Sequence, residues 1–85
     1  MTHQVLLKRS AERELDHLAE PTASRVLKRI AALTDNPKPF GVQKLVGEED
    51  LYRVRVGDYR ILYSIDDRAK QVEIVSVAHR REVYR

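Results

Sequence analysis

The sequence predicts an α+β domain in which two antiparallel helices pack on a mainly antiparallel, twisted sheet, with the element order β-α-α-β-β-β. Two observations carry this prediction. Apolar residues recur at helical spacing in the first half of the chain, whereas from residue 51 they alternate with polar residues. Because 85 residues leave room for one hydrophobic core, a single domain over residues 1–85 is expected.

A short strand and a first helix are expected at the beginning of the chain. Residues 4–8 read as a strand, and Ser10 is a candidate N-cap for a helix that ends near Leu18. The helix is supported by Ala11, Leu15 and Leu18, which recur at helical spacing.

A second helix is expected to begin at Pro21, with Glu20 or a neighbour as its cap, because proline fits the first turn of a helix. Residues 36–39, Asn-Pro-Lys-Pro, end it, since neither proline can continue a helix. Its sequence predicts an apolar stripe and an outward polar face. The predicted stripe is Val26, Leu27, Ile30, Ala31 and Leu33, and the outward residues are Arg25, Lys28 and Arg29.

The second half of the chain predicts a hairpin. Residues 51–56 and 59–65 alternate in polarity on either side of Gly57-Asp58, a pair that is typical of a two-residue turn. The predicted cross-strand pairs are Val56 with Tyr59, Arg55 with Arg60, Val54 with Ile61, and Arg53 with Leu62. A last strand, from Val72 to about Ala78, is apolar on both faces and is expected inside the sheet.

The excess of positive charge lies in the C-terminal part of the chain, residues 51–85. Residues 1–50 carry eight Lys/Arg and eight Asp/Glu, whereas residues 51–85 carry eight Lys/Arg and five Asp/Glu. Most of these later cations are arginines, which suit bidentate phosphate contacts. This asymmetry favours an anionic partner, nucleic acid before membrane. A slightly basic, solvated surface is the alternative.

The predicted register gathers Arg53, Arg55 and Arg60 on one solvent-facing side of the hairpin. A like-charge pair such as Arg55 and Arg60, directly opposite each other, destabilises a sheet by up to ~1 kcal/mol. An anionic ligand or an acidic partner would relieve this repulsion. The alternative is a structural role, in which Glu73 on the next strand neutralises one arginine.

The C-terminal segment, residues 79–85, can fold over the edge of the same sheet face because it follows directly from the last strand. Its sequence, HRREVYR, offers guanidinium groups, an imidazole and a phenol. A guanidinium stabilises charge on phosphate oxygens, and a tyrosine such as Tyr84 stacks on a base or moves a proton. Simple packing is the alternative role of this tyrosine.

Composition excludes several classes of site. The chain has no cysteine, which removes disulfides, thiolate nucleophiles and sulfur-ligated zinc. His3 and His17 stand apart from any carboxylate cluster, so they are expected to be surface residues and no metal or cofactor is predicted. No apolar run has the length of a membrane span, and no secretion signal is evident. A soluble, cytoplasmic protein is expected.

Two segments resemble a known family. Residues 51–63, LYRVRVGDYRILY, resemble the Y-R-[IV]-R-x-G-x-Y-R-[IV]-x-Y core of the RelE/ParE superfamily of bacterial toxins. The lead-in is also similar, with Asn36-Pro37, Lys44-Leu45 and Gly47. Residues 77–84 are similar to the H-R-x-x-V-Y tail of the RelE branch. The resemblance covers nearly the whole chain.

The resemblance implies the RelE-like, microbial RNase-like fold and the activity of a type II toxin. Such a toxin is a metal-independent endoribonuclease, an mRNA interferase that enters the A site of the 70S ribosome and cuts the codon there. The mRNA 2′-hydroxyl attacks the adjacent phosphate, translation is inhibited and growth stops. The implied partner is a cognate RelB-like antitoxin with an acidic C-terminal segment.

The resemblance also implies roles for individual residues. The catalytic ones are Arg60, which stabilises the phosphate, Arg80, which serves the leaving group, and Tyr84, which stacks on the substrate base. Arg53 and Arg55 match substrate-binding basic residues that are often lysines, and Arg81 is a substrate-binding residue or an alternative to Arg80. Since guanidinium groups stay protonated, no strong general base is evident. His79 is either a titrating group or a structural one.

Two other functions are compatible with the same fold. One is a ParE-like inhibitor of DNA gyrase, which binds a protein and cuts nothing. The other is an inactive member that acts only with its antitoxin in repression. The tail with Arg80 and Tyr84 favours the RelE branch.

Overall fold

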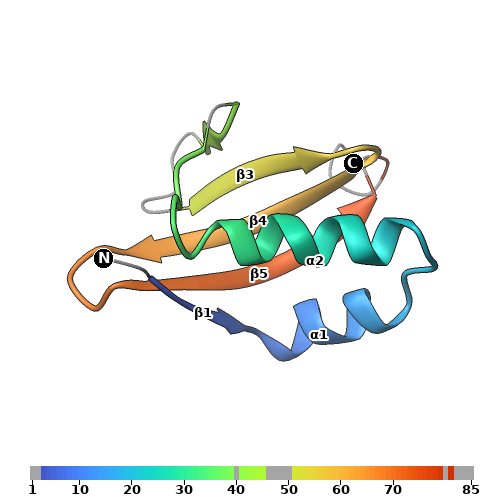
Figure 1. Ribbon diagram of the computed structural model, residues 1–85, viewed down its shortest axis with the longest axis horizontal. Coiled ribbons are helices and arrows are strands. Elements are labelled where there is room, and N and C mark those ends of the chain that lie inside the picture. The colour runs from blue at the N-terminus through green and yellow to red at the C-terminus, as the bar shows by residue number, and fades with distance from the viewer. Residues whose placement is uncertain (1–2, 40, 46–50, 80, 82–85) are drawn as a thin grey trace.

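The computed structural model describes residues 3–39, 41–45, 51–79 and 81. Along the chain the elements are β1 (Gln4–Leu7), α1 (Arg9–Asp16), α2 (Thr22–Ala32), β2 (Gln43–Lys44), β3 (Leu51–Val56), β4 (Tyr59–Asp66) and β5 (Gln71–His79). The strands form a sheet in the order β1-β5-β4-β3-β2 (Figure 1). Only the β1–β5 pair is parallel among the strand pairs of these residues. The α+β prediction is confirmed, with β2 as an unexpected edge strand.

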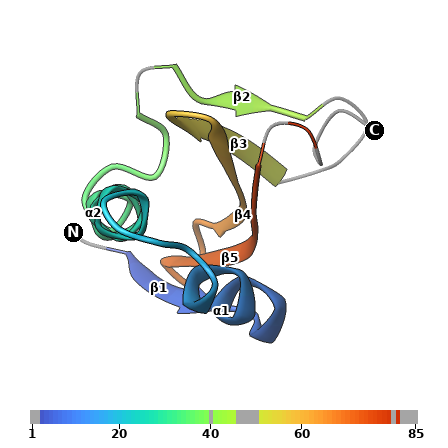
Figure 2. The same ribbon diagram turned by 90° about the vertical axis from the view of Figure 1, so that its right-hand side faces the viewer.

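The helices pack on one face of the sheet, and Figure 2 shows α2 and α1 along the same side of the curved strands. In Figure 1, α2 runs back over the sheet in the direction opposite to α1, as predicted. No helix in the described part of the chain is long and apolar enough to cross a membrane. The buried core consists of Ala11, Val26, Ile30 and Leu33 from the helical half and Val54, Ile61, Tyr63, Ile65, Val72, Ile74 and Val77 from the sheet.

The β3–β4 hairpin has the predicted register. Arg55 lies opposite Arg60, and the other three predicted cross-strand pairs are also present. Gly57 adopts a φ of 60° at the first turn position, a conformation that L side chains rarely adopt. A Cβ at Gly57 would meet nothing within 4 Å, so backbone conformation and not space favours glycine here. The last strand, β5, lies between β1 and β4, inside the sheet as expected.

Side chains of α1 continue the edge of the sheet where β1 ends. The β1–β5 pairing stops at Leu7 and Ile74. Beyond it, the Ser10 hydroxyl donates to the carbonyl of Val75 at 2.9 Å, and the Glu14 carboxylate accepts the backbone N–H of Val77 at 2.9 Å. Two side chains one helical turn apart therefore satisfy backbone groups that a neighbouring strand would otherwise bind.

This contact corrects the prediction that Ser10 caps α1. The helix begins at Arg9, with Lys8 at the N-cap position and no side-chain cap. The backbone N–H of Lys8 still donates to Ile74 at 2.9 Å, so the helix starts directly from the strand, and the Ser10 hydroxyl is engaged by β5. The helix ends at Asp16, two residues before the predicted Leu18.

The start of α2 is close to the prediction. Pro21 occupies the N-cap position, and the helix begins at Thr22. The Glu20 carboxylate accepts the backbone N–H of Ser24 at 2.8 Å and its hydroxyl at 2.7 Å. These hydrogen bonds from Ser24 hold the pKa of Glu20 below its ordinary value. Glu20 thus binds one of the free N–H groups at the beginning of the helix, as a cap would.

The apolar stripe predicted for α2 is only partly correct. Leu27 is 53% exposed and Ala31 is also exposed, whereas Val26, Ile30 and Leu33 are buried. Arg29, predicted to face outward, is half-buried. The helix turns a narrow face to the sheet, so residues at the borders of the predicted stripe remain at the surface.

Tyr63 joins the sheet to the loop that follows α2. Its side chain is fully buried, its hydroxyl donates to the carbonyl of Pro37 at 2.7 Å, and its ring stacks on Tyr52 with centroids 6.0 Å apart. Burial, and then the neighbouring Tyr52, raise the pKa of Tyr63 to about 12. The phenol therefore remains a hydrogen-bond donor well above neutral pH.

We expect Glu14→Ala to lower the free energy of unfolding by about 1–3 kcal/mol, because it leaves the N–H of the buried Val77 without its acceptor. Urea unfolding would measure the shift in midpoint at constant slope. The matched control is Glu12→Ala, an exposed glutamate of the same helix. Equal stability of the two variants would contradict the role of Glu14 at the sheet edge.

Candidate nucleic-acid interface

Three arginines line one depression on the sheet face opposite the helices. The depression has a volume of about 270 Å³, and its described lining consists of Gly41, Gln43, Arg53, Arg55 and Arg60. We call it the arginine depression. Cross-strand pairing of Arg55 with Arg60, and of Gln43 with Arg53, directs these side chains to the same side of the sheet. The predicted gathering of the arginines is confirmed.

Arg60 lies deeper than predicted. It is 9% exposed and forms the floor of the arginine depression, whereas a solvent-facing position was expected. The physical reason is its place on β4, the middle strand, with β3 on one side and β5 on the other. One guanidinium nitrogen, Nη1, donates to the carbonyl of Tyr59 at 3.5 Å. A cation with so little solvent is held in a nearly fixed position.

The two arginines at the rim are oriented by hydrogen bonds. Nη2 of Arg53 donates to Oε1 of Gln43 at 2.7 Å, and Nε of Arg55 donates to the carbonyl of Gly57 at 2.9 Å. These hydrogen bonds restrict both side chains, so less conformational freedom is lost when a ligand binds them. Sequence reasoning missed Gln43, because a strand of two residues carries no alternation that could reveal it.

Glu73 does not neutralise this cluster. Its cross-strand partner is Ser64, four residues along β4 from Arg60, whereas Arg60 lies opposite Ala78. Glu73 is also absent from the described lining of the depression. The alternative in which Glu73 neutralises one of the arginines is therefore wrong.

The tail residues are placed only in part. Arg80 and Tyr84 lie outside the described residues, so their predicted roles stay predictions. Arg81 is exposed and is not among the described residues that line the arginine depression. Its backbone N–H donates to Nδ1 of His79 at 3.2 Å.

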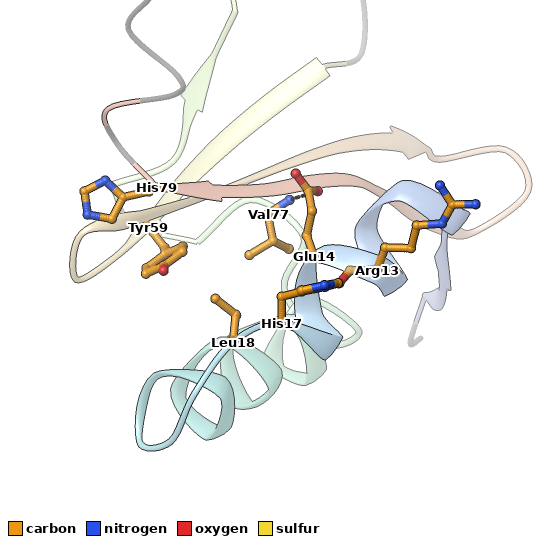
Figure 3. Close-up of a pocket in the computed structure, with 7 residues that line it drawn as sticks. All are labelled: Arg13, Glu14, His17, Leu18, Tyr59, Val77 and His79. Atoms are coloured by element: carbon orange, nitrogen blue, oxygen red, sulfur yellow. Dashed lines mark hydrogen bonds between the residues drawn. The ribbon is translucent and has the colours of Figure 1, made fainter.

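His79 lies on the helix face of the sheet, not on the face of Arg60. It is the register partner of Tyr59, and the two rings meet edge to face with centroids 5.3 Å apart. Figure 3 shows both side chains at the border of a pocket of about 340 Å³ that also receives Leu18 and Val77. This placement argues against proton transfer between His79 and a phosphate bound at Arg60.

The other two histidines, His3 and His17, differ in solvent exposure. The side chain of His3 is 9% exposed, with Nε2 at 3.3 Å from the Asp67 carboxylate, so the expectation of a surface residue is wrong for it. His17 is exposed, as expected, and its Nδ1 lies 2.7 Å from the carbonyl of Arg13. Within the part of the chain that is described, no three acidic, histidine or cysteine side chains are grouped as a metal site.

Comparisons with known proteins identify the family. A family model described as the ParE toxin of the type II toxin–antitoxin system parDE matches residues 5–84. The chain belongs to the RelE/ParE toxin superfamily. Toxin RelE of Mycobacterium tuberculosis is 34% identical over 84 residues, which cover 98% of this chain and 87% of that protein. By this relationship the chain is a RelE-like toxin of a type II toxin–antitoxin system.

Solved RelE structures share the fold. RelE in the archaeal RelE–RelB complex from Pyrococcus horikoshii has a TM-score of 0.83 and 34% identity, covering 94% of this chain and 97% of that one. The toxin–antitoxin complex RelBE2 from Mycobacterium tuberculosis gives a TM-score of 0.81 and 28% identity, covering 93% of this chain and 99% of the matched chain. The two helices on a mostly antiparallel sheet are therefore the RelE-like fold.

We expect Arg55→Gln to raise the free energy of unfolding by up to about 1 kcal/mol at low ionic strength, because it removes a cation directly opposite Arg60. The gain should vanish near 1 M salt, where the screening length is about 3 Å. Urea unfolding at both ionic strengths measures it. The matched control, Arg55→Lys, retains the charge and should keep the parental salt dependence; identical salt dependence of the Gln variant would refute the repulsion.

Proposed function

We propose that this RelE-like toxin is a ribosome-dependent endoribonuclease that cuts mRNA at A-site codons. The observation that carries the proposal is the convergence of Arg53, Arg55 and Arg60 in one depression on the sheet face that the helices leave open. Guanidinium groups in this arrangement suit a phosphodiester, because each can donate two parallel hydrogen bonds to phosphate oxygens. Because the proposed target is the ribosome, the proposal also places this toxin in the cytoplasm.

The proposed reaction is a transesterification within the RNA. The 2′-hydroxyl attacks the adjacent phosphorus, and the bond to the 5′-oxygen of the next nucleotide breaks. The proton leaves the 2′-oxygen, another is delivered to the 5′-oxygen, and a 2′,3′-cyclic phosphate remains. Negative charge grows on the non-bridging oxygens in the transition state, where the nearly fixed guanidinium of Arg60 would stabilise it with no metal ion. Arg53 and Arg55 would bind the flanking backbone.

Positioning supplies much of the proposed rate. The arginines cannot act as a general base because their guanidinium groups stay protonated. Orientation of the reacting groups can remove roughly 7–11 kcal/mol from a barrier, and the ribosome would provide this orientation for the mRNA. The toxin is therefore expected to cleave free RNA only weakly, because free RNA lacks this orientation. By resemblance, Arg80 would serve the leaving group, with Arg81 as the alternative, and Tyr84 would stack on the base.

A gyrase inhibitor is the second candidate function, and the specific observation in its favour is the ParE description of the matched family model. The two candidates separate in one experiment. Induced expression followed by mapping of mRNA 5′ ends gives codon-phased cuts for a RelE-type activity. Intact messages with gyrase-linked DNA breaks indicate a ParE-type activity, and neither effect indicates an inactive member that acts only in repression.

We expect Arg60→Ala and Arg80→Ala each to slow cleavage of ribosome-bound mRNA by about 10²–10³-fold, since removing one donor to the transition-state charge costs about 2.7–4 kcal/mol. Primer extension on a translated reporter measures the rate. Arg68→Ala, in the exposed β4–β5 turn, is the control and should cut at the parental rate. Because Arg60 is nearly buried, its variant is first checked for a cooperative thermal transition. Parental rates in both variants would refute the assignment.

The proposal includes a cognate antitoxin as partner. The matched structures from Pyrococcus horikoshii and Mycobacterium tuberculosis are toxin–antitoxin complexes. We infer a RelB-like antitoxin whose acidic C-terminal segment binds the cationic sheet face, because opposite charge steers an extended acidic chain to such a surface. A segment that folds on binding can cover much of so small a toxin.

We expect the antitoxin to slow amide exchange in β3 and β4 around the arginine depression, or to alter exchange in residues 80–85. Hydrogen–deuterium exchange of the toxin alone and in the complex measures this. Exchange in β1, at the far side of the sheet, is the internal reference. If neither region changes on binding, inhibition works by blocking entry into the ribosome alone.

A further inference from the structure

A second depression adjoins the arginine depression at the turn end of the hairpin. It has a volume of about 430 Å³, and its lining includes Arg25 of α2, Arg55 and Asp58 of the hairpin, and the rings of Tyr59 and His79. We call it the hairpin-end depression. Arg55 lines both depressions, so it connects the open face of the sheet, where Arg60 lies, with the helix face, where Tyr59 and His79 lie, around the turn end of the hairpin.

The aromatic pair in this depression is held in place. Tyr59 and His79 are both half-buried, and their rings meet edge to face at an interplanar angle of 83° (Figure 3). The backbone N–H of Arg81 donates to Nδ1 of His79, which fixes the orientation of the imidazole. An edge-to-face contact leaves ring surface uncovered by the partner ring. The pair is thus a pre-formed surface on which a planar group can stack.

Cations surround the aromatic pair and continue beyond it. Arg25 and Arg55 are exposed, and Arg55 is anchored through Nε to the carbonyl of Gly57. Arg25 and Arg55 also line a neighbouring groove of about 420 Å³, together with Lys28 and Arg29. Positive charge therefore runs around the turn end of the hairpin, from Arg60 on the open face over Arg55 to α2 on the helix face. Such a track fits a chain of phosphates better than one isolated anion.

Aromatic rings between cations are typical of surfaces that bind single-stranded nucleic acid. An acidic peptide is less well matched, because it would use the cations of the depression but brings no base to stack on the rings. The amino groups of a nucleobase can donate to a carboxylate. Ring surface, cations and one carboxylate together favour a nucleotide as the occupant.

We propose that the hairpin-end depression is a binding subsite for the nucleotide that flanks the scissile phosphate of the RNA. Its base stacks on the Tyr59–His79 pair, and its phosphate lies between Arg25 and Arg55. The proposal rests on the proposed function, because the bound nucleotide belongs to the same RNA strand whose scissile phosphate is bound at Arg60. Arg25 is then a substrate-binding residue outside the core and tail motifs, and Tyr59 and His79 are motif residues that gain a substrate-binding role.

The test measures binding of fluorescent RNA oligonucleotides whose riboses are 2′-O-methylated and cannot attack. We expect the parental toxin to bind a trinucleotide at least about fivefold more tightly than a dinucleotide, the gain from one stacked base. Arg25→Ala and His79→Ala should lose this gain, and His79→Phe should restore it by returning an aromatic ring. Arg25→Ala should also reduce the salt slope of log K by about 0.7.

Arg68→Ala, the same charge change in an exposed turn, is the control and should keep the gain and the slope. Unchanged trinucleotide binding in both Arg25→Ala and His79→Ala overturns the subsite. Loss of antitoxin affinity with unchanged RNA affinity overturns it as well and assigns the depression to a protein partner. Cleavage of ribosome-bound mRNA by the parental toxin is measured separately, so failure of the proposed nuclease activity is distinguishable from failure of the subsite.

Discussion

The register of the β3–β4 hairpin is the constraint on which both faces of the sheet depend. With Arg55 opposite Arg60, Val54 and Ile61 point to the helices and are 2% and 0% exposed. A slip of one residue would exchange the two faces, move the arginines into the core and expose its apolar residues. Each residue of these strands therefore faces either the core or the charged depression. The free-energy cost of placing the arginine guanidinium groups in the apolar core disfavours the slipped register.

The helices complete this sheet in different ways. The second helix, α2, buries Val26 and Ile30 against the strands, and Leu33, the residue that follows its last turn, is buried with them. The first helix, α1, also acts on the edge, where Ser10 and Glu14 bind backbone groups of β5 beyond the end of β1. An unpaired strand edge invites association with other strands, so this protection also limits unwanted pairing. The face with the arginines is left open by both helices.

The clustered arginines that suit the proposed function lower the stability of the fold. Concentrating arginines on one part of a small sheet costs stability through repulsion, and placing Arg60 at 9% exposure adds a desolvation cost. A domain with one small core has little stability in reserve. Such local costs are typical of functional sites, and an anionic ligand would offset them. The same positive potential would accelerate encounter with RNA and with an acidic antitoxin.

The sequence by itself determined the features that depend on neighbouring residues. Alternation and the Gly57-Asp58 turn fixed the hairpin register, and the register fixed the shared face of Arg53, Arg55 and Arg60. Periodicity and prolines located the helices to within a few residues. The arginine cluster could therefore be predicted, whereas most of the tail lies outside the described residues and its roles stay predictions.

Only the tertiary structure decided the features that depend on distant contacts. The Ser10 hydroxyl binds Val75, 65 residues away, and no local pattern distinguishes this from capping. The depth of Arg60 follows from strand order, and Leu27 is exposed because packing, not periodicity, sets the width of a buried helix face. The strand β2 is too short for a periodic signal. Local chemistry specifies conformation and register, whereas burial is a property of the assembled layers.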